Sequence, residues 1–566
     1  MKIERKHIVW LVTLVAVLSL FPFLGLNEFH TKGEPREAVV SLSMLLQDNV
    51  ILPENNGGDI PYKPPFLHWC IAAISYLLGT LNEYISRVPS AISLVLLSVA
   101  TYLFYKRRSG EWTAVLTAMV GITCFELHRA GGNCRVDMVL SSAMVIGSFL
   151  LYRWWEKDKM KGLPWMSLIA LSLATLTKGP VGVCLPLFVF GVFLLIRKES
   201  VFRIIIKLFP VFLCSLIAPA LWYWAAYQQG GQPFLDLIYE ENVGRLTGTM
   251  TYSSHEGPAI INFVYLISGF VPWTILLMVS LFFKPWQYCK SEEKPNSWKE
   301  RLSKWWDKMV SMEDYRLFTL LNAVLIIGFF CIPKSKRSVY LMPAFPFIAY
   351  FIAEYMLWIE SRIKKANDIY RNILIGVVAL LFVAHVVFSF DIVHVSKPAT
   401  QAMFSALADL NLFAVAVVFG IAFAIIWWLR KCNDNRIALP ALGLVVFAIL
   451  DALTLPAILN TKSVKWYAEE INKIVPEGDI YSFLETDIRP NANMMHQFEL
   501  DYYLNDRVKL FLREKPESGK LIVLEKELET YRDNIFADYE IKEILRTDRN
   551  YGTFKDIILL VDINKK

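Results

Sequence analysis

The chain has 566 residues, of which 55% are hydrophobic, 19% are charged and 14% are aromatic. A soluble domain is nearer about a quarter charged, so this composition excludes an ordinary soluble protein and predicts an integral membrane protein. The net charge is +6, and the eight cysteines show neither a Cys-X-X-Cys pair nor metal-ligand spacing. We interpret the cysteines as small buried residues, and we predict no nucleic-acid partner.

About thirteen apolar runs approach the roughly 20 residues that a membrane-spanning helix needs. The first run follows three basic residues but is long enough to span, so we interpret it as a retained helix and not as a cleavable signal. Residues 66–80 are also apolar, but they are few and include His68, so they are predicted to lie at the membrane surface. The predicted spans are residues 8–26, 88–105, 112–127, 137–154, 164–177, 180–197, 204–226, 260–283, 316–332, 339–358, 372–390, 411–429 and 437–457.

The basic loops predict the orientation of these spans. With a cytoplasmic N-terminus, every strongly basic loop falls on the cytoplasmic side, as the positive-inside rule requires. An odd number of spans then places the C-terminus outside, together with a first outer loop at 27–66 and a later outer loop at 227–260. The chain is thus predicted to be a mainly α, multi-pass helical bundle of the cytoplasmic (inner) membrane. The basic loops are residues 106–108, 153–161, 197–198, 284–308, 362–371 and 430–436.

The composition changes near residue 461, which divides the chain into two predicted domains. Residues 1–460 form the transmembrane domain, and residues 461–566 form a small soluble α/β domain on the outer side. Within the second domain, residues 463–475 have the pattern of an amphipathic helix. Three short strands are predicted at residues 479–483, 520–524 and 556–561.

Outer loops should be poor in Lys and Arg, so the basic residues that they contain are informative. Snorkelling to the headgroups explains any one of these cations, but it explains the whole set poorly. Cations gathered at one membrane surface need a counter-charge, and a lipid phosphate supplies one. We therefore predict a site for a phosphate-bearing lipid. The outer cations are Lys32, Arg36, Lys63, Arg87, Arg129, Arg135, Lys178, Arg245, Lys334, Lys336 and Arg337.

Two acids are candidates for catalysis. Pro35 suits the first turn of a helix, which would leave Glu34 at the helix N-terminus, exposed and ionised, where it can accept a proton from an acceptor hydroxyl. Asp137 lies at the outer mouth of a span, where a carboxylate is costly without a partner or a function. Arg135 is a possible partner, so a plain salt bridge remains an alternative for Asp137, and a plain helix-start acid remains one for Glu34.

Several short motifs follow one another in a fixed order across the whole membrane part. The motifs are Glu34-Pro35-Arg36, Tyr62-Lys63-Pro64-Pro65, Arg87-Val88-Pro89-Ser90, Arg135-Val136-Asp137-Met138, Thr177-Lys178-Gly179-Pro180, Glu241-Asn242-Val243-Gly244-Arg245, His255-Glu256-Gly257-Pro258, and Lys336-Arg337 with Tyr340-Leu341 and Pro343. No single motif is specific, but the ordered set resembles that of the GT-C glycosyltransferases, in the group of the dolichyl-phosphate-mannose protein mannosyltransferases and the lipid A aminoarabinose (ArnT-like) transferases.

This resemblance implies a fold and an activity. The fold is a GT-C bundle of about thirteen spans with an exported C-terminal domain. The activity is inverting transfer of a sugar from a polyprenyl-phosphate donor to an acceptor that is lipid A, another glycolipid, a polysaccharide or a protein. We expect a monomer. A flippase or transporter of lipid-linked sugars, and a membrane sensor, are the alternatives.

The resemblance also implies roles for particular residues. Glu34 is the expected base and Asp137 a second functional acid. The aminoarabinose transferases carry an Asp before this Glu, where this chain has Gly33, and their zinc-associated Glu and His appear here as Tyr62 and Asn242. We therefore predict no metal and no cofactor. The residues expected to hold the carrier phosphate are Arg36, Lys63, Arg135, Lys178, Arg245, Lys336, Arg337 and Tyr340.

Overall fold

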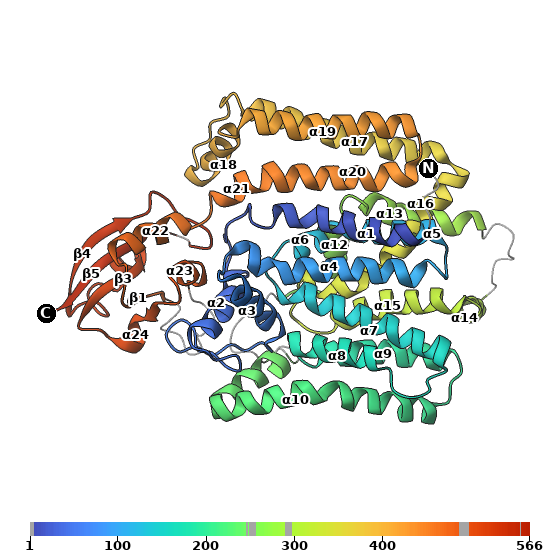
Figure 1. The fold of residues 1–566 in the computed structure, drawn as a ribbon, viewed down its shortest axis with the longest axis horizontal. Coiled ribbons are helices and arrows are strands. Elements are labelled where there is room, and N and C mark those ends of the chain that lie inside the picture. Colours follow the sequence, from blue (N-terminus) through green and yellow to red (C-terminus); the bar gives the residue numbers. More distant parts are fainter. Residues whose placement is uncertain are drawn as a thin grey trace.

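The structure is a computed structural model that describes residues 5–244, 247, 249, 256–288, 297–485, 497–554 and 556–566. These residues form a long bundle of helices that run parallel or antiparallel to one another, with a small sheet domain at one end (Figure 1). The predicted fold class, a helical membrane bundle with a small C-terminal sheet domain, is confirmed.

A helix lies in each segment that was predicted to span. Eight helices among the described residues are long and apolar enough to cross a membrane by themselves, and six shorter apolar helices accompany them. The exact number of spans therefore stays a prediction. The helices of this part are α1 (Arg5–Leu20), η1 (Phe21–Phe23), α2 (Pro35–Leu46), α3 (Phe66–Leu78), α4 (Glu83–Tyr105), α5 (Glu111–Ile122), α6 (Phe125–Gly131), α7 (Val136–Asp158), α8 (Trp165–Lys178), α9 (Val181–Ile196), α10 (Val201–Tyr239), η2 (Glu240–Gly244), α12 (Ile260–Gly269), α13 (Thr274–Tyr288), α14 (Trp298–Val310), α15 (Asp314–Cys331), η4 (Ser338–Ala344), α16 (Phe345–Arg362), α17 (Lys364–Phe388), α18 (Pro398–Ala408), α19 (Leu412–Cys432), α20 (Asn435–Ile449), η5 (Leu450–Thr454) and α21 (Leu455–Asn460).

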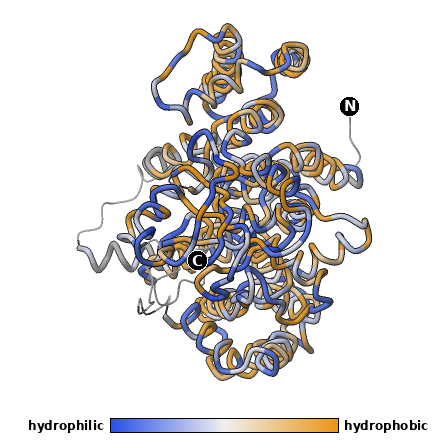
Figure 2. The backbone as a smooth tube through the Cα atoms, turned by 90° about the vertical axis from the view of Figure 1, so that its left-hand side faces the viewer, coloured by the Kyte–Doolittle hydropathy of each residue, from blue (hydrophilic) through white to orange (hydrophobic). Residues whose placement is uncertain are grey.

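Central and peripheral helices differ in how much of their apolar surface the protein covers. In the most hydrophobic stretch of α7 78% of the residues are buried, but in that of α17 only 17% are. A helix that is apolar all round and left uncovered by protein requires lipid as its solvent. Figure 2 looks along the bundle from the sheet domain and shows that the outlying helices are largely hydrophobic. The periphery is thus the part of the bundle that faces lipid.

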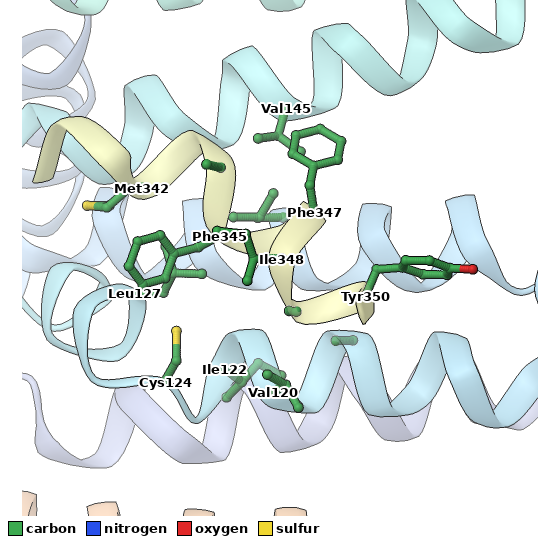
Figure 3. Close-up of a cluster of buried hydrophobic side chains, with 14 of the residues drawn as sticks. Val120, Ile122, Cys124, Leu127, Val145, Met342, Phe345, Phe347, Ile348 and Tyr350 are labelled. Carbon is green, nitrogen blue, oxygen red and sulfur yellow. The ribbon is translucent and has the colours of Figure 1, made fainter. Parts of the chain in front are cut away.

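The centre of the bundle is packed by aliphatic and aromatic side chains of α5, α6, α7 and α16. Phe345 and Ile348 of α16 lie beside Leu127 of α6, while Phe347 lies against Val145 of α7 (Figure 3). These five side chains are at most 8% exposed. Such close packing fixes the relative positions of α6, α7 and α16, whose neighbouring ends carry several of the predicted site residues.

The tight turn between α8 and α9 depends on two glycines. Gly179 has φ +93°, a conformation that side chains disfavour. A Cβ on Gly182 would lie 2.5 Å from the carbonyl carbon of Ala174, so only glycine lets α9 approach α8 this closely. The turn confirms the predicted break after Lys178 and leaves that lysine at the C-terminus of α8.

The segment between α1 and α4 folds over one end of the bundle, where α2 and α3 lie between the spanning helices and the sheet domain (Figure 1). With thirteen residues, α3 is too short to span, as the sequence predicted. Its last turn is exposed and apolar: Tyr76 and Leu77 are each 80% exposed.

The C-terminal domain holds a five-stranded sheet in the order β2-β1-β3-β5-β4. The pairs β1–β2 and β1–β3 are parallel, whereas β5 is antiparallel to β3 and β4. The three predicted strands are present as β1, β3 and β5, and the predicted helix is α22; β2 and β4 were not predicted. The elements are α22 (Lys465–Ile474), β1 (Ile480–Ser482), α23 (Phe498–Tyr503), β2 (Val508–Leu510), α24 (Phe511–Glu514), β3 (Ser518–Leu524), α25 (Glu525–Thr530), β4 (Tyr539–Arg546) and β5 (Ile558–Lys565).

The sheet domain contacts the segment around α2 through α23 and the residues that follow it. Tyr503 donates a hydrogen bond to Glu83 at 2.9 Å and accepts one from the backbone of Phe29. The Ser43 hydroxyl on α2 donates to the Asp506 carboxylate at 2.6 Å. The C-terminal domain is therefore joined to the α2 segment and the start of α4 at the end of the bundle that carries α2 and α3.

Candidate functional site

The N-terminus of α2 buries Glu34 in an ion pair with Arg87 of α4. Arg87 donates through Nε to one carboxylate oxygen at 2.8 Å and through Nη2 to the other at 3.1 Å, and the backbone N–H of Cys134 donates to the first at 2.8 Å. Arg87 also binds the carbonyl oxygens of Leu24 and Asn27, each at 2.6 Å. Burial raises the pKa of the Glu34 carboxyl, but Arg87 outweighs it and holds that pKa below its usual value.

The predicted helix start at Pro35 is confirmed, but the expected exposure of Glu34 is wrong. Glu34 is 2% exposed and Arg87 is 1% exposed. Because its two oxygens already accept hydrogen bonds from the protein, Glu34 joins α2, α4 and the start of α7. The sequence could not show this, because Arg87 is 53 residues away from Glu34.

One helical turn further along α2, the carboxylate of Glu37 contacts three basic side chains. Arg36 and Lys63 contact one of its oxygens, and His68 of α3 contacts the other at 3.1 Å. Burial raises the pKa of the Glu37 carboxyl, but Lys63 and Arg36 outweigh it and hold that pKa well below its usual value. Burial, with Arg36 beside it, lowers the pKa of the Lys63 ammonium to about 7, although Glu37 acts against this. The group includes Tyr62, whose ring lies 5.5 Å from Arg36 and 5.4 Å from Lys63.

The third carboxylate, Asp137, lies in the first turn of α7 and forms an ion pair with Lys178 at the end of α8. Lys178 also lies over the ring of Tyr340 in η4, 4.6 Å from its centre. Asp137 is 8% exposed, and it interacts electrostatically with Lys63 and Arg135 as well. The sequence proposed Arg135 as the partner of Asp137, but the ion pair goes to Lys178.

Arg135, the residue before α7, lies against Gly33. A Cβ placed on Gly33 would be 2.3 Å from Nη2 of Arg135 and 2.7 Å from Cζ. The Nε atom of Arg135 is enclosed, and no acceptor among the described residues is hydrogen-bonded to it. Arg135 thus brings a positive charge to within reach of the start of α2.

The remaining residues that were predicted to bind the carrier phosphate differ in their hydrogen-bond partners. Lys336 is 3% exposed, and its ammonium donates to the carbonyl oxygens of Phe330, Cys331 and Pro333 at the end of α15. It is held by the protein itself. Arg337, like Arg135, has an enclosed Nε without a hydrogen-bond acceptor in the part of the chain that the structure describes. Arg245 lies outside the described residues.

The structure therefore brings most of the predicted residues together at the end of the bundle that carries α2. Electrostatic contact with Lys63 joins the Glu37 group to the Asp137–Lys178 pair. The cations come from separate elements, the loop before α3 and the ends of α2, α7 and α8, so the fold and not the local sequence creates the positive field. Cations beside carboxylates at such a place can bind a phosphate group and position a hydroxyl for proton removal.

Sequence reasoning did not assign a role to Glu37 or His68 in this arrangement. It placed Arg87 among the outer cations that face a lipid phosphate, whereas the structure pairs Arg87 with Glu34. The spacing of Glu34 and Glu37, three residues apart on one helix, was the available signal that both face the same way. No comparable pattern links His68 to Glu37, because they are 31 residues apart.

Tyr62 and Asn242 stand at the two positions where the resemblance implied zinc-associated residues, and the structure describes both. Besides the cation contacts of Tyr62, Asn242 in η2 donates to the carbonyl of Ile238 at 2.9 Å. Within the described ranges, no group of three or more His, Cys, Asp or Glu side chains is placed to hold a metal ion.

Comparisons with known proteins agree with this architecture. The family described as dolichyl-phosphate-mannose-protein mannosyltransferase matches residues 62–224. An uncharacterized protein of Aquifex aeolicus (strain VF5) is 25% identical over 477 residues, which is 84% of each chain. The undecaprenyl phosphate-alpha-4-amino-4-deoxy-L-arabinose arabinosyl transferase of Erwinia tasmaniensis is 24% identical over 454 residues, or 77% of this chain and 76% of that protein. These similarities support a GT-C glycosyltransferase of the ArnT-like group.

A solved member shows that the ArnT-like fold extends over the whole chain. The crystal structure of ArnT from Cupriavidus metallidurans bound to undecaprenyl phosphate matches with a TM-score of 0.69 and 18% sequence identity, and the match covers 99% of this chain and 98% of that chain. The resemblance stated from the motifs is confirmed, and this ArnT-like chain is a membrane glycosyltransferase.

Proposed function

We propose that the enzyme moves a sugar from a polyprenyl-phosphate donor to a hydroxyl of an envelope acceptor, on the outer face of the cytoplasmic membrane. The observation that carries this proposal is the meeting of Lys63, Lys178 and Asp137 at one end of a lipid-facing bundle. A polyprenyl chain partitions into lipid, so its phosphate is presented at this depth. The relative from Erwinia, whose name specifies an undecaprenyl phosphate donor, supports the same class of substrate.

Basic residues at the other end of the bundle support the proposed orientation. Arg108, just after α4, forms an ion pair with Glu156 of α7, and Arg197, just after α9, forms one with Asp314 of α15. These arginines lie at the helix ends away from the Lys63 site, where the positive-inside rule places the cytoplasm. The site, the C-terminal domain and the loops at 27–66 and 227–260 are then outside.

The proposed reaction is a single displacement with inversion. The acceptor oxygen attacks the anomeric carbon of the donor sugar while the bond from that carbon to the phosphate oxygen breaks. The bonding electrons leave with the polyprenyl phosphate, whose growing negative charge Lys63 and Lys178 stabilise. The proton of the acceptor hydroxyl passes to a carboxylate.

Among the three carboxylates, we assign the proton to Asp137. Glu34 binds Arg87 and the Cys134 N–H with both oxygens engaged, and Glu37 binds basic side chains through both of its oxygens. Among the described residues, the carboxylate of Asp137 accepts a hydrogen bond only from Lys178, through Oδ1. When a donor phosphate draws the ammonium of Lys178 toward itself, the carboxylate of Asp137 is free to accept a proton. Glu34 then has a positioning role.

Transfer and binding measurements on purified protein test this function. With a panel of undecaprenyl-phosphate-linked radiolabelled sugars and envelope fractions, wild-type protein is expected to release undecaprenyl phosphate and label an acceptor. Lys63→Ala removes a charge-assisted contact, so binding of undecaprenyl phosphate is expected to weaken by about 10- to 100-fold. Lys520→Ala is the matched control, because Lys520 forms a partly exposed ion pair within the sheet domain.

Each possible result of these measurements has a distinct meaning. Equal binding by wild type and Lys63→Ala contradicts the proposed phosphate site. Movement of labelled donor across a membrane without release of sugar favours the flippase alternative.

A further inference from the structure

A cavity of about 740 Å³ lies between the loop at 27–66, the C-terminal part of α10 and the C-terminal domain. Gln47 and Glu54 line it from the loop, Gln229 lines it from α10, and Arg513 of α24 reaches it from the sheet domain. Its volume falls within the range of about 300–1,000 Å³ that is typical of sites for small molecules. The proposed reaction so far gives this cavity no task.

The backbone shapes the walls of this cavity. Gly231 has φ +55° and interrupts α10 with a kink beside it. A Cβ on Gly230 would lie 2.7 Å from Cδ2 of Leu52, so a glycine is needed where α10 meets the loop. Arg513 donates a hydrogen bond to the carbonyl oxygen of Gly57 at 2.7 Å, which holds the sheet domain against the loop. The cavity is therefore formed before any ligand enters it.

The cavity adjoins the proposed reaction site. Ile60, which lines it, precedes Lys63 by three residues, so their Cα atoms are at most about 11 Å apart. Leu52 also lines it and packs in one apolar cluster with Leu176, which is two residues before Lys178 on α8. The cavity thus lies next to the cations that are proposed to hold the donor phosphate, where the second substrate of a transfer reaction must bind.

The lining of the cavity suits hydroxyl groups better than anions. Among the described residues that line it, the carboxylates of Glu54 and Asp59 stand against one guanidinium, that of Arg513, which is paired with Asp59. A phosphate group in this cavity meets surplus negative charge, in contrast to the site around Lys63. A sugar hydroxyl both donates and accepts hydrogen bonds, so it matches the carboxylate of Glu54 and the amide of Gln229.

We infer that this cavity binds an uncharged saccharide unit of the acceptor, so that the enzyme adds its sugar to a neutral glycan. This inference rests on the proposed function, because it names the acceptor of that reaction. An uncharged saccharide is the chemistry that a glycolipid headgroup and a polysaccharide share, and the experiment separates these two sources.

The chemical nature of the labelled acceptor tests the inference. Purified wild-type protein receives radiolabelled undecaprenyl-phosphate sugars and envelope fractions, and the labelled product is partially hydrolysed and analysed by mass spectrometry. The labelled sugar is expected in a glycosidic bond to an uncharged sugar unit. Extraction with chloroform and methanol then separates a lipid-linked product from a polysaccharide.

Two variants test whether the cavity holds that acceptor. Gln229→Ala and Glu54→Ala each remove one hydrogen-bonding side chain, so each is expected to raise the acceptor KM by about 3- to 10-fold. The kcat and the binding of undecaprenyl phosphate should change little, because neither side chain belongs to the cation site. Glu54 bonds Gln47 through its backbone, so the loop keeps these hydrogen bonds in Glu54→Ala. Gln232→Ala is the matched control, because Gln232 lies on α10 outside the cavity lining.

The outcomes distinguish this inference from the proposed function. If the labelled sugar is attached to a protein hydroxyl, or to a sugar unit that carries a phosphate or a carboxylate, the inference is overturned and the proposed function stands. If Gln229→Ala and Glu54→Ala both keep the acceptor KM of Gln232→Ala, the cavity does not hold the acceptor, and the inference is again overturned. If wild type transfers no sugar from any undecaprenyl-phosphate donor, the proposed function itself fails.

Discussion

Glu34 and Asp137 are two carboxylates with the same predicted task and opposite surroundings. Glu34 forms a two-point ion pair with Arg87, accepts a third hydrogen bond from the backbone and is 2% exposed. Asp137 forms a one-point ion pair with Lys178 and is 8% exposed. A buried pair whose donors and acceptors are all matched holds elements together, whereas a pair with an unused oxygen can exchange its partner for a substrate. This difference supports our proposal that Glu34 has a structural role and that Asp137 accepts the proton.

The largest effect is expected from Asp137→Asn, which keeps the shape of the side chain but removes proton acceptance. The transfer rate should fall by about 10²–10⁴, with donor affinity changed far less. Single-turnover transfer and equilibrium binding of undecaprenyl phosphate measure the two quantities. Should the rate remain near that of wild type while Glu34→Gln abolishes it with the fold intact, the two roles are reversed.

Arg87→Ala tests the other side of the comparison, because it leaves the buried Glu34 carboxylate without a cation. Breaking a buried pair in this way costs about 3–5 kcal/mol, so the thermal midpoint in detergent should fall sharply. Glu34→Gln should also lower the midpoint, since it leaves the Arg87 charge unmatched. Asp137→Asn should leave the midpoint closer to wild type. Equal midpoints for Arg87→Ala and Asp137→Asn contradict the distinction.

The pH dependence of donor binding tests whether the charge of Lys63 contributes to phosphate binding. Because the pKa of Lys63 is lowered to about 7, its ammonium is charged below that pH and increasingly neutral above it. Affinity for a sugar phosphodiester, which stays a monoanion over this range, should fall several-fold from pH 6 to pH 8. Lys63→Arg should flatten the profile, because a guanidinium stays charged. A profile that keeps its slope in Lys63→Arg assigns the dependence to another group.

The smallest effect is expected from a third kind of carboxylate, which is buried and forms no ion pair with a cation in the part of the chain that the structure describes. Asp501 of α23 is fully buried beside Asp506, and burial followed by the charge of Asp506 raises its pKa well above the usual value. A carboxyl with a raised pKa in the folded state makes the protein less stable as pH rises above the unfolded value of about 4. Asp501→Asn should therefore raise the free energy of unfolding by about 1 kcal/mol at pH 8.

The same substitution provides its own control at low pH. Near pH 4 Asp501 is protonated in the folded protein, so the variant and the wild type should unfold with similar free energies. A stabilisation of the same size at both values indicates that the charge of Asp501 is not its cause.

The sequence by itself determined the class of the protein, the positions of the apolar helices and most of the residues that the structure brings together at the candidate site. Runs of apolar residues need lipid wherever the chain places them, and Pro35 and Gly179 act on their own local backbone. Basic residues in loops that should lack them were enough to indicate an anionic substrate. These are properties of short segments, so they can be read without knowing what lies beside each segment.

Only the tertiary structure decided which charge meets which. Arg87 reaches Glu34 because α4 begins beside the start of α2, and Lys178 reaches Asp137 because α8 ends beside the start of α7. The partners are 53 and 41 residues apart, and no periodicity of the sequence encodes such distances. A carboxylate can act as a base or serve only to hold helices together. Which of the two it does depends on how many hydrogen-bond donors the fold places at its oxygens and on how much water the fold excludes from it. Position 33 must be a glycine in this conformation because the guanidinium of Arg135, which is distant in sequence, occupies the space that a side chain would need.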